Sequence, residues 1–137
     1  MSQVFVDSSV WVDYFRGVES ATTTALDELL GRSEAVIGDL VLMEILQGYR
    51  LRRELHAAEA ALSEVHCVDL AGTMRARKAA ANHRYLRSVG VTPRTAVDVL
   101  IASYCASEGL DLLADDRDFN LMAPHLALSL RSPPLNG

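Results

Sequence analysis

Cysteine, lysine and long apolar runs are the scarce features of this sequence of 137 residues. Its two cysteines, Cys67 and Cys105, lie among apolar neighbours in the sequence and are expected to be buried thiols of a reducing compartment, not a disulfide or a zinc site. No apolar run approaches the length that spans a bilayer, and the first residues form neither a basic stretch nor a long apolar segment. We therefore expect a cytoplasmic protein that does not enter a membrane.

Positive charge is also in deficit, because 13 Lys and Arg stand against 18 Asp and Glu and give a formal net charge of −5. A general nucleic-acid coat protein would need more positive charge, since phosphate binding depends on Lys and Arg. The balance is compatible with an enzyme that gathers carboxylates in one pocket. The positions of the acids are therefore the informative feature.

Short apolar segments alternate with helical ones along the chain. Strands are expected at 3–6, 35–37, 65–68, 110–114 and 126–130, and helices at 10–15, 20–30, 40–47, 51–63, 70–88 and 95–108. This alternation predicts an α/β fold, a three-layer α/β/α sandwich around a mostly parallel central sheet. We expect one domain over residues 1–137, with a loose tail from about residue 132, where Pro133 and Pro134 cannot continue a sheet.

Acidic residues directly follow two of the expected strands. Asp7 comes after the first strand, and Asp115 and Asp116 come after the strand at 110–114. Ligands gather at the carboxyl ends of parallel strands, so these acids could meet in one cleft. Each of them, taken singly, could equally be a turn or cap residue.

Two further acids interrupt apolar helices. Glu44 lies within 41–46, which is apolar on nearly every side and predicts a largely buried helix. A lone buried carboxylate is costly unless it is paired or bound to a metal; the alternative is a solvent-facing Glu44 or an ion pair with arginine. Asp98 heads an apolar stripe of Ile101, Ala102 and Cys105, and its alternative role is capping or interaction with the helix dipole.

Gathered in one cleft, these carboxylates would repel one another unless a cation were present. Mg²⁺ and Mn²⁺ prefer such an all-oxygen environment, whereas the four histidines show no metal-ligand spacing: His56, His66, His83 and His125. The chemistry that fits is metal-assisted hydrolysis of a phosphodiester.

Four segments resemble motifs of the PIN-domain ribonucleases, and within them of the VapC toxins of bacterial toxin–antitoxin pairs. They contain a strand-end Asp followed by serines, a Glu-apolar-Leu-x-Gly helix, an Asp-x-Leu-Ile-Ala helix and a strand followed by Asp-x-Asp-Phe, at 6–11, 43–48, 97–102 and 112–119. Each motif alone is weak, but all four occur in order over the chain to about residue 130. The resemblance implies an endoribonuclease with a PIN-like sandwich fold.

The resemblance further implies a catalytic set of Asp7, Glu44, Asp98 and Asp116 that holds Mg²⁺ or Mn²⁺, with Asp7, Asp98 and Asp116 as metal ligands. Ser9 and Asp118 would support this site. One departure is Asp115, where the family often has a polar or basic residue, which leaves open which of the acids at 115, 116 and 118 points inward. The acids without a motif match are expected to be solvated or capping: Asp13, Asp39 and Asp111.

The same resemblance implies an RNA substrate, a VapB-like antitoxin as partner and a homodimer. Trp11, Tyr14 and Phe15 are an aromatic cluster that either packs in the core or lines the groove for that antitoxin. The basic residues at 50–53 and 75–87 are either a solvated face or a rim that holds RNA phosphates.

Two other functions compete with the ribonuclease. A catalytically silent PIN-like binding module would lack one or more of the four acids, and none is missing. A phosphoacceptor receiver domain would show an acidic pair after the first strand and a lysine after a later one. Here Asp7 is followed by two serines, and the single lysine, Lys78, lies in an expected helix.

Overall fold

The computed structural model describes residues 3–131 and contains a sheet of four parallel strands in the order β3-β2-β1-β4. The central strand β1 pairs with β2 on one side and with β4 on the other, so that Val4 lies opposite both Ala35 and Asp111. The strands are short and apolar: β1 (Val4–Val6), β2 (Ala35–Gly38), β3 (His66–Val68) and β4 (Asp111–Leu113). The tail expected from about residue 132 lies outside the described residues.

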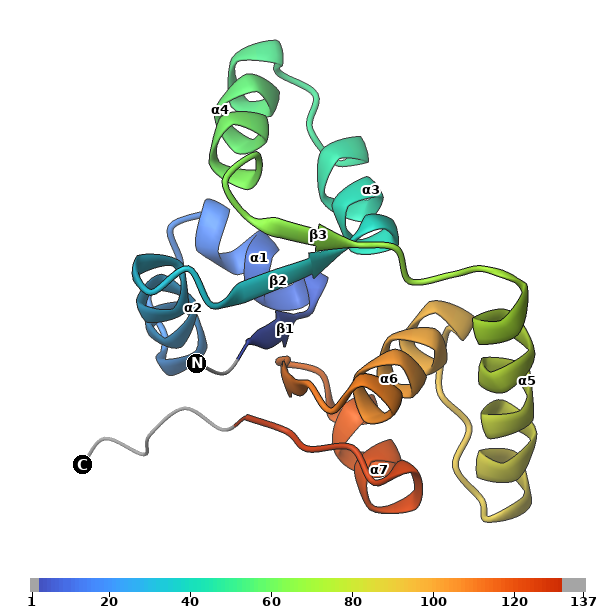
Figure 1. Cartoon of the computed structure of the whole chain (residues 1–137). Helices are drawn as coiled ribbons and strands as arrows, with labels where there is room; N and C mark the ends of the chain where they lie inside the picture. The colour runs from blue at the N-terminus through green and yellow to red at the C-terminus, as the bar shows by residue number, and fades with distance from the viewer. Residues whose placement is uncertain (1–2, 132–137) are drawn as a thin grey trace.

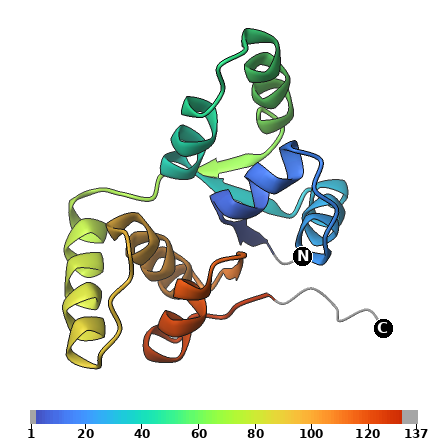
Figure 2. The same cartoon turned by 180° about the vertical axis from the view of Figure 1, so that it is seen from behind.

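Seven helices connect and follow these strands. The path β1-β2-β3 moves in one direction across the sheet and the step from β3 to β4 returns to the opposite edge, so right-handed crossovers place α1–α4 and α5–α6 on opposite faces. Figures 1 and 2 show α5, α6 and α7 as one group and α1–α4 as another. The bounds are α1 (Ser8–Phe15), α2 (Ala21–Gly31), α3 (Asp39–Gln47), α4 (Arg52–Leu62), α5 (Thr73–Ser88), α6 (Ala96–Glu108) and α7 (Arg117–Leu126). The expected α/β/α sandwich is confirmed.

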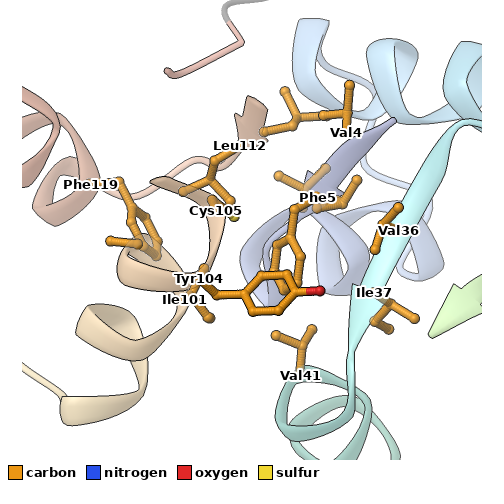
Figure 3. Packing of buried hydrophobic residues seen from close by; sticks show 14 of the residues in the cluster. Val4, Phe5, Val36, Ile37, Val41, Ile101, Tyr104, Cys105, Leu112 and Phe119 are labelled. Carbon is orange, nitrogen blue, oxygen red and sulfur yellow. The ribbon is translucent and has the colours of Figure 1, made fainter. Parts of the chain in front are cut away.

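The core is built on β1, which is covered on both faces. Val4, Phe5 and Val6 are completely buried, as expected for a strand that reads as a continuous apolar run. Figure 3 shows the Phe5 ring beside that of Tyr104 of α6, with their centroids 6.2 Å apart, and Val41 of α3 next to them. This packing fixes the end of β1 and therefore the position of Asp7, which follows it.

The strand expected at 126–130 is wrong. Helix α7 continues to Leu126 although it contains Pro124, and Ala127 then adopts a left-handed conformation with φ 56° that turns the chain. The following residues make only an isolated parallel bridge between Leu130 and Leu112 of β4. The helix was missed because Pro124 interrupts the helical pattern near its end.

The expectation that both cysteines are buried is correct for one of them and wrong for the other. Cys105 is buried in the core, but Cys67 is exposed, because β3 is an edge strand and its side chains His66 and Cys67 are not covered. In residues 3–131, no helix has both the length and the apolar character needed to cross a bilayer.

Gly38 ends β2 and precedes α3 at a point of close packing. A Cβ atom at this position would lie 2.5 Å from Cδ1 of Leu70 and 2.9 Å from Cζ of Phe5, and both side chains are completely buried. The absence of a side chain at Gly38 therefore lets β2, the Leu70 segment and β1 approach one another at the carboxyl end of the sheet.

We predict that Gly38→Ala lowers the free energy of unfolding by about 1–3 kcal/mol, because the new methyl group overpacks this contact. Urea unfolding followed by circular dichroism measures the change. Gly31→Ala is the matched control, since a Cβ there meets nothing within 4 Å and alanine favours the helix. Equal losses in both variants would contradict the packing argument.

Candidate active site

A cleft of about 450 Å³ opens where β1 and β4 end. All four acids singled out from the sequence line it, and they come from the end of β1, from α3, from α6 and from the residue that caps α7. The lining residues are Asp7, Ser8, Ser9, Val12, Asp13, Glu44, Arg94, Thr95, Asp98 and Asp116. The fold therefore brings together acids that are far apart in the sequence.

Asp7 is the most enclosed of these four acids, with 4% of its surface exposed. It caps α1, and its Oδ2 accepts hydrogen bonds from the Ser9 backbone N–H at 3.3 Å and from the Ser9 hydroxyl at 2.8 Å. Burial raises the pKa of Asp7 despite these bonds, and the charge of Asp116 adds to the rise. The Ser9 Oγ also accepts from the Asp115 backbone N–H at 3.2 Å, so it connects the ends of β1 and β4.

The expectation that Glu44 lies in a largely buried helix is wrong. Only Val41 and Ile45 of α3 are buried, while Met43, Glu44 and Gln47 are exposed, because α3 packs through one face only. Glu44 still lines the cleft from this open side. Partial loss of surrounding water raises its pKa, and the charge of Asp7 adds to the effect.

Asp98 lies in the first turn of α6, next to the cap residue Thr95. The Asp98 backbone N–H donates to the Thr95 hydroxyl at 3.2 Å, and the carboxyl group is half-buried. Burial raises the pKa of Asp98 to about 6, with a further contribution from Asp7 and smaller ones from Asp116 and Asp118. The apolar stripe that Asp98 heads is buried as expected: Ile101, Ala102 and Cys105.

The three acids after β4 differ in their exposure. Asp115 is exposed, Asp116 is half-buried, and Asp118 has only 8% of its surface exposed. Asp116 caps α7 by accepting the Asp118 backbone N–H at 3.0 Å. Asp98, Asp116 and Asp118 each offer a carboxylate oxygen, and these oxygens lie within 4.8 Å of one another.

Arg94 is the main site residue that the sequence did not reveal. Its Nη2 donates to Asp116 Oδ1 at 3.0 Å and its Nε donates to Asp118 Oδ2 at 3.2 Å. The Arg94 backbone N–H also donates to Asp118, and these bonds together hold the pKa of Asp118 below its usual range. Thr95 and Asp13 also line the cleft, although neither belongs to a recognised motif. Asp13 was expected to be a solvated or capping residue.

The aromatic cluster after Asp7 is mainly core. Trp11 is 1% exposed, its Nε1 donates to the Val6 carbonyl oxygen at 3.1 Å, and its ring stacks on Phe15 at 6.0 Å. The prediction that Trp11 lines a groove is therefore wrong. Tyr14 donates its hydroxyl to Asp27 of α2 at 2.9 Å, and Tyr14 and Phe15 are half-buried, so for these two a groove stays a prediction.

The basic residues of α5 do not all have the same surroundings. Arg75 pairs with Glu108 at 3.6 Å, lies over the Tyr104 ring at 4.7 Å and donates to the Asp69 carbonyl oxygen. Arg75 therefore connects α5 to α6. The other basic side chains of α5 are exposed, and their role as an RNA rim stays a prediction: Arg77, Lys78, Arg84 and Arg87.

The donor set of the cleft fits a hard divalent cation. Three carboxylate oxygens converge, three more acids line the same cleft, and no histidine or cysteine lines the described cleft. Such all-oxygen sites suit Mg²⁺ and Mn²⁺. Burial raises the pKa values of Asp7, Glu44 and Asp98, and the charges of neighbouring acids in the cleft add to the rise.

Two kinds of relative resemble the chain in sequence and in structure. The sequence is 29% identical over 122 residues to Ribonuclease VapC11 of Mycobacterium tuberculosis and to VapC ribonuclease Mb1587 of Mycobacterium bovis, covering 88% of this chain and 91% of each relative. The fold matches a DNA-bound VapBC crystal structure from Salmonella typhimurium with a TM-score of 0.77 at 20% identity, over 96% of this chain and 98% of that one. It also matches DNA-bound VapBC2 from Rickettsia felis with a TM-score of 0.74 at 17% identity, over 93% and 96% of the two chains.

The PIN domain family profile matches residues 4–123, which include β1, the cleft acids and most of α7. This match spans most of the sequence and contains all the elements that build the cleft. The chain belongs to the PIN domain family.

Proposed function

We propose that this protein is a metal-dependent ribonuclease and the toxin of a VapBC-type toxin–antitoxin pair. The observation that carries the proposal is the convergence of Asp7, Glu44, Asp98 and Asp116 in one cleft of a PIN domain. The sequence relatives that are named VapC ribonucleases support the choice of RNA as substrate.

The carboxylates would hold a divalent cation, Mg²⁺ or Mn²⁺. The proposed ligands are Asp7, Asp98 and Asp116, which all line the cleft, and Asp118 lies close to Asp98 and Asp116. When bound, such an ion acts as a Lewis acid that acidifies water and stabilises charge on the attacked phosphate.

The protein side chains have separate tasks in this proposal. Ser9 fixes the Asp7 carboxylate, because its hydroxyl and its backbone N–H both donate to Oδ2. Glu44 lines the cleft and is exposed to solvent, so it can accept a proton from a water molecule that attacks the phosphodiester. Thr95 holds the first turn of α6 and thereby the position of Asp98.

The proposed partner is a VapB-like antitoxin, as in the VapBC assemblies that share this fold. Its docking region would include the half-buried Tyr14 and Phe15 near the cleft residues Val12 and Asp13. We further propose a homodimer that acts on RNA in the cytoplasm. Light scattering of the purified chain, alone and with the antitoxin, tests the assembly.

A silent binding module remains the alternative outcome. The presence of all four acids in one cleft favours the enzyme over that module. The cleft does not favour a receiver domain, because that function requires a lysine near the acids. Lys78 lies on α5 and does not line the cleft.

We predict that Asp7→Asn reduces RNA cleavage by about 100-fold or more, because a neutral amide weakens the charge that a catalytic cation needs. The measurement is cleavage of total cellular RNA with Mg²⁺, with Mn²⁺ and with chelator. Asp115→Asn is the matched control: Asp115 is exposed, and asparagine keeps the backbone N–H that donates to Ser9.

Cleavage by the wild-type protein and the Asp115 variant, absent in chelator and in the Asp7 variant, would support the nuclease. Wild-type protein freed of antitoxin that cuts no RNA with either metal would overturn it in favour of the silent module. Equal cleavage by both variants would show that Asp7 is not needed for catalysis.

We predict that the cation-free protein becomes less stable as pH rises from about 4 through about 6. The pKa of Asp98 is raised from 3.8 to about 6 in the folded state, so the folded protein holds a proton that the unfolded chain has already released in this range. Asp98→Asn should therefore melt higher than wild type at pH 7.5 in chelator, and the difference should shrink toward pH 4.5.

Thermal unfolding of both proteins from pH 4.5 to 7.5 measures this. Added Mn²⁺ should raise the melting temperature of wild type more than that of the variant, because binding to the folded state stabilises it. A pH-independent difference between the two proteins would contradict the assignment of the titration to Asp98.

A further inference from the structure

Arg94 places a positive charge in a cleft that, among the described residues, has no other cationic lining residue. It lies one residue before Thr95, the cap of α6, and reaches across to the N-terminus of α7. Its guanidinium pairs with Asp116 at 3.0 Å and with Asp118 at 3.2 Å. These are two of the three acids whose oxygens converge.

A cation that binds this cluster must compete with the guanidinium. Both bind the carboxylates of Asp116 and Asp118, and a divalent ion placed beside the guanidinium is repelled by its positive charge. The pairs with Asp116 and Asp118 raise the pKa of Arg94, so its charge is retained at any physiological pH.

The Arg94 side chain is exposed and lightly held. The Arg94 side chain is 70% exposed, and within residues 3–131 it bonds only to the two carboxylates. Exposed ion pairs of this kind are weak. The Arg94 backbone N–H donates to the same Asp118 Oδ2 at 3.1 Å, so the main chain keeps a contact with this carboxylate when the guanidinium turns away.

We propose that Arg94 has two alternative partners: it neutralises Asp116 and Asp118 in the cation-free cleft, and it turns to an RNA phosphate when a cation takes those carboxylates. The planar fork of a guanidinium suits both partners, since it binds carboxylates and phosphates in the same bidentate way. The second half of this inference rests on the proposed ribonuclease function. Arg94 thereby lowers the affinity of the free cleft for a cation, and it strengthens RNA binding once a cation is bound.

The test measures Mn²⁺ binding by isothermal titration calorimetry without RNA. Arg94→Gln should bind Mn²⁺ about tenfold more tightly than wild type, because one competing charge is removed. Arg94→Lys keeps the charge and should stay within about threefold of wild type. A purely structural role for Arg94 would give the opposite sign, since a loosened cleft would bind the ion more weakly.

Arg117→Gln is the matched control for charge. Arg117 begins α7 between Asp116 and Asp118 in sequence, is exposed, and does not line the described cleft. Its loss should change Mn²⁺ affinity less than Arg94→Gln does, because Arg117 acts on Asp118 only through a charge that solvent and salt screen.

Steady-state cleavage at saturating Mn²⁺ tests the second partner. Arg94→Gln should raise KM for RNA about tenfold or more in spite of its tighter metal binding, and Arg94→Lys should recover part of that loss. The pairing of tighter metal binding with weaker RNA binding is the signature expected of this residue.

The outcomes separate this inference from the proposed function. RNA cleavage by wild type, together with unchanged or weaker Mn²⁺ binding by Arg94→Gln, would overturn the inference and leave the nuclease intact. Tighter Mn²⁺ binding by Arg94→Gln in a protein that cuts no RNA would uphold the competition for the carboxylates and overturn the nuclease. An unchanged KM in Arg94→Gln would overturn the role toward phosphate.

Discussion

The parallel pairing of β1 with β4 is the constraint on which the cleft depends. Val6 lies opposite Leu113, and the Asp7 backbone N–H continues the ladder by donating to the Leu113 carbonyl oxygen at 3.0 Å. This register brings the residues after both strands to one level, where the Ser9 hydroxyl can contact the Asp7 carboxylate and the Asp115 amide together. A shift by one residue would move every side chain of β1 to the other face and separate the two ends.

The cleft is an electrostatically costly part of an otherwise well-packed protein. Burial and mutual repulsion raise the pKa values of Asp7, Glu44 and Asp98, which means that their charged forms are disfavoured in the fold. Helix caps, the Ser9 hydroxyl and Arg94 reduce this cost without removing it. The completely buried β1 on which the site is built supplies the compensating packing energy. Because the charged carboxylates repel one another, binding of a cation or of a positively charged partner to the cleft is favoured.

The sequence predicted what local patterns encode and missed what depends on distant contacts. Asp7 and Asp116 were found because strand ends are visible as apolar runs that stop at an acid. Glu44 was found for a wrong reason, since one face of α3 is left open by packing that the sequence does not show. Arg94 could not be found, because its partners lie more than twenty residues away and an arginine before a helix cap has no distinctive pattern. Helix α7 was hidden by Pro124, and Trp11 could not be assigned to core or groove until its contact with Val6 was known.

The wide separation of the cleft acids along the chain also determines when the site can exist during synthesis. A nascent chain that ends before α6 contains Asp7 and Glu44 but neither Asp98 nor Asp116, and it also lacks β4, the second neighbour of β1. Because chains emerge from the ribosome in order and compact units fold as they are completed, the carboxylates can converge only after the chain has been released as far as α7. A translation product that stops before α6 therefore carries only half of the four acids and cannot form the cleft.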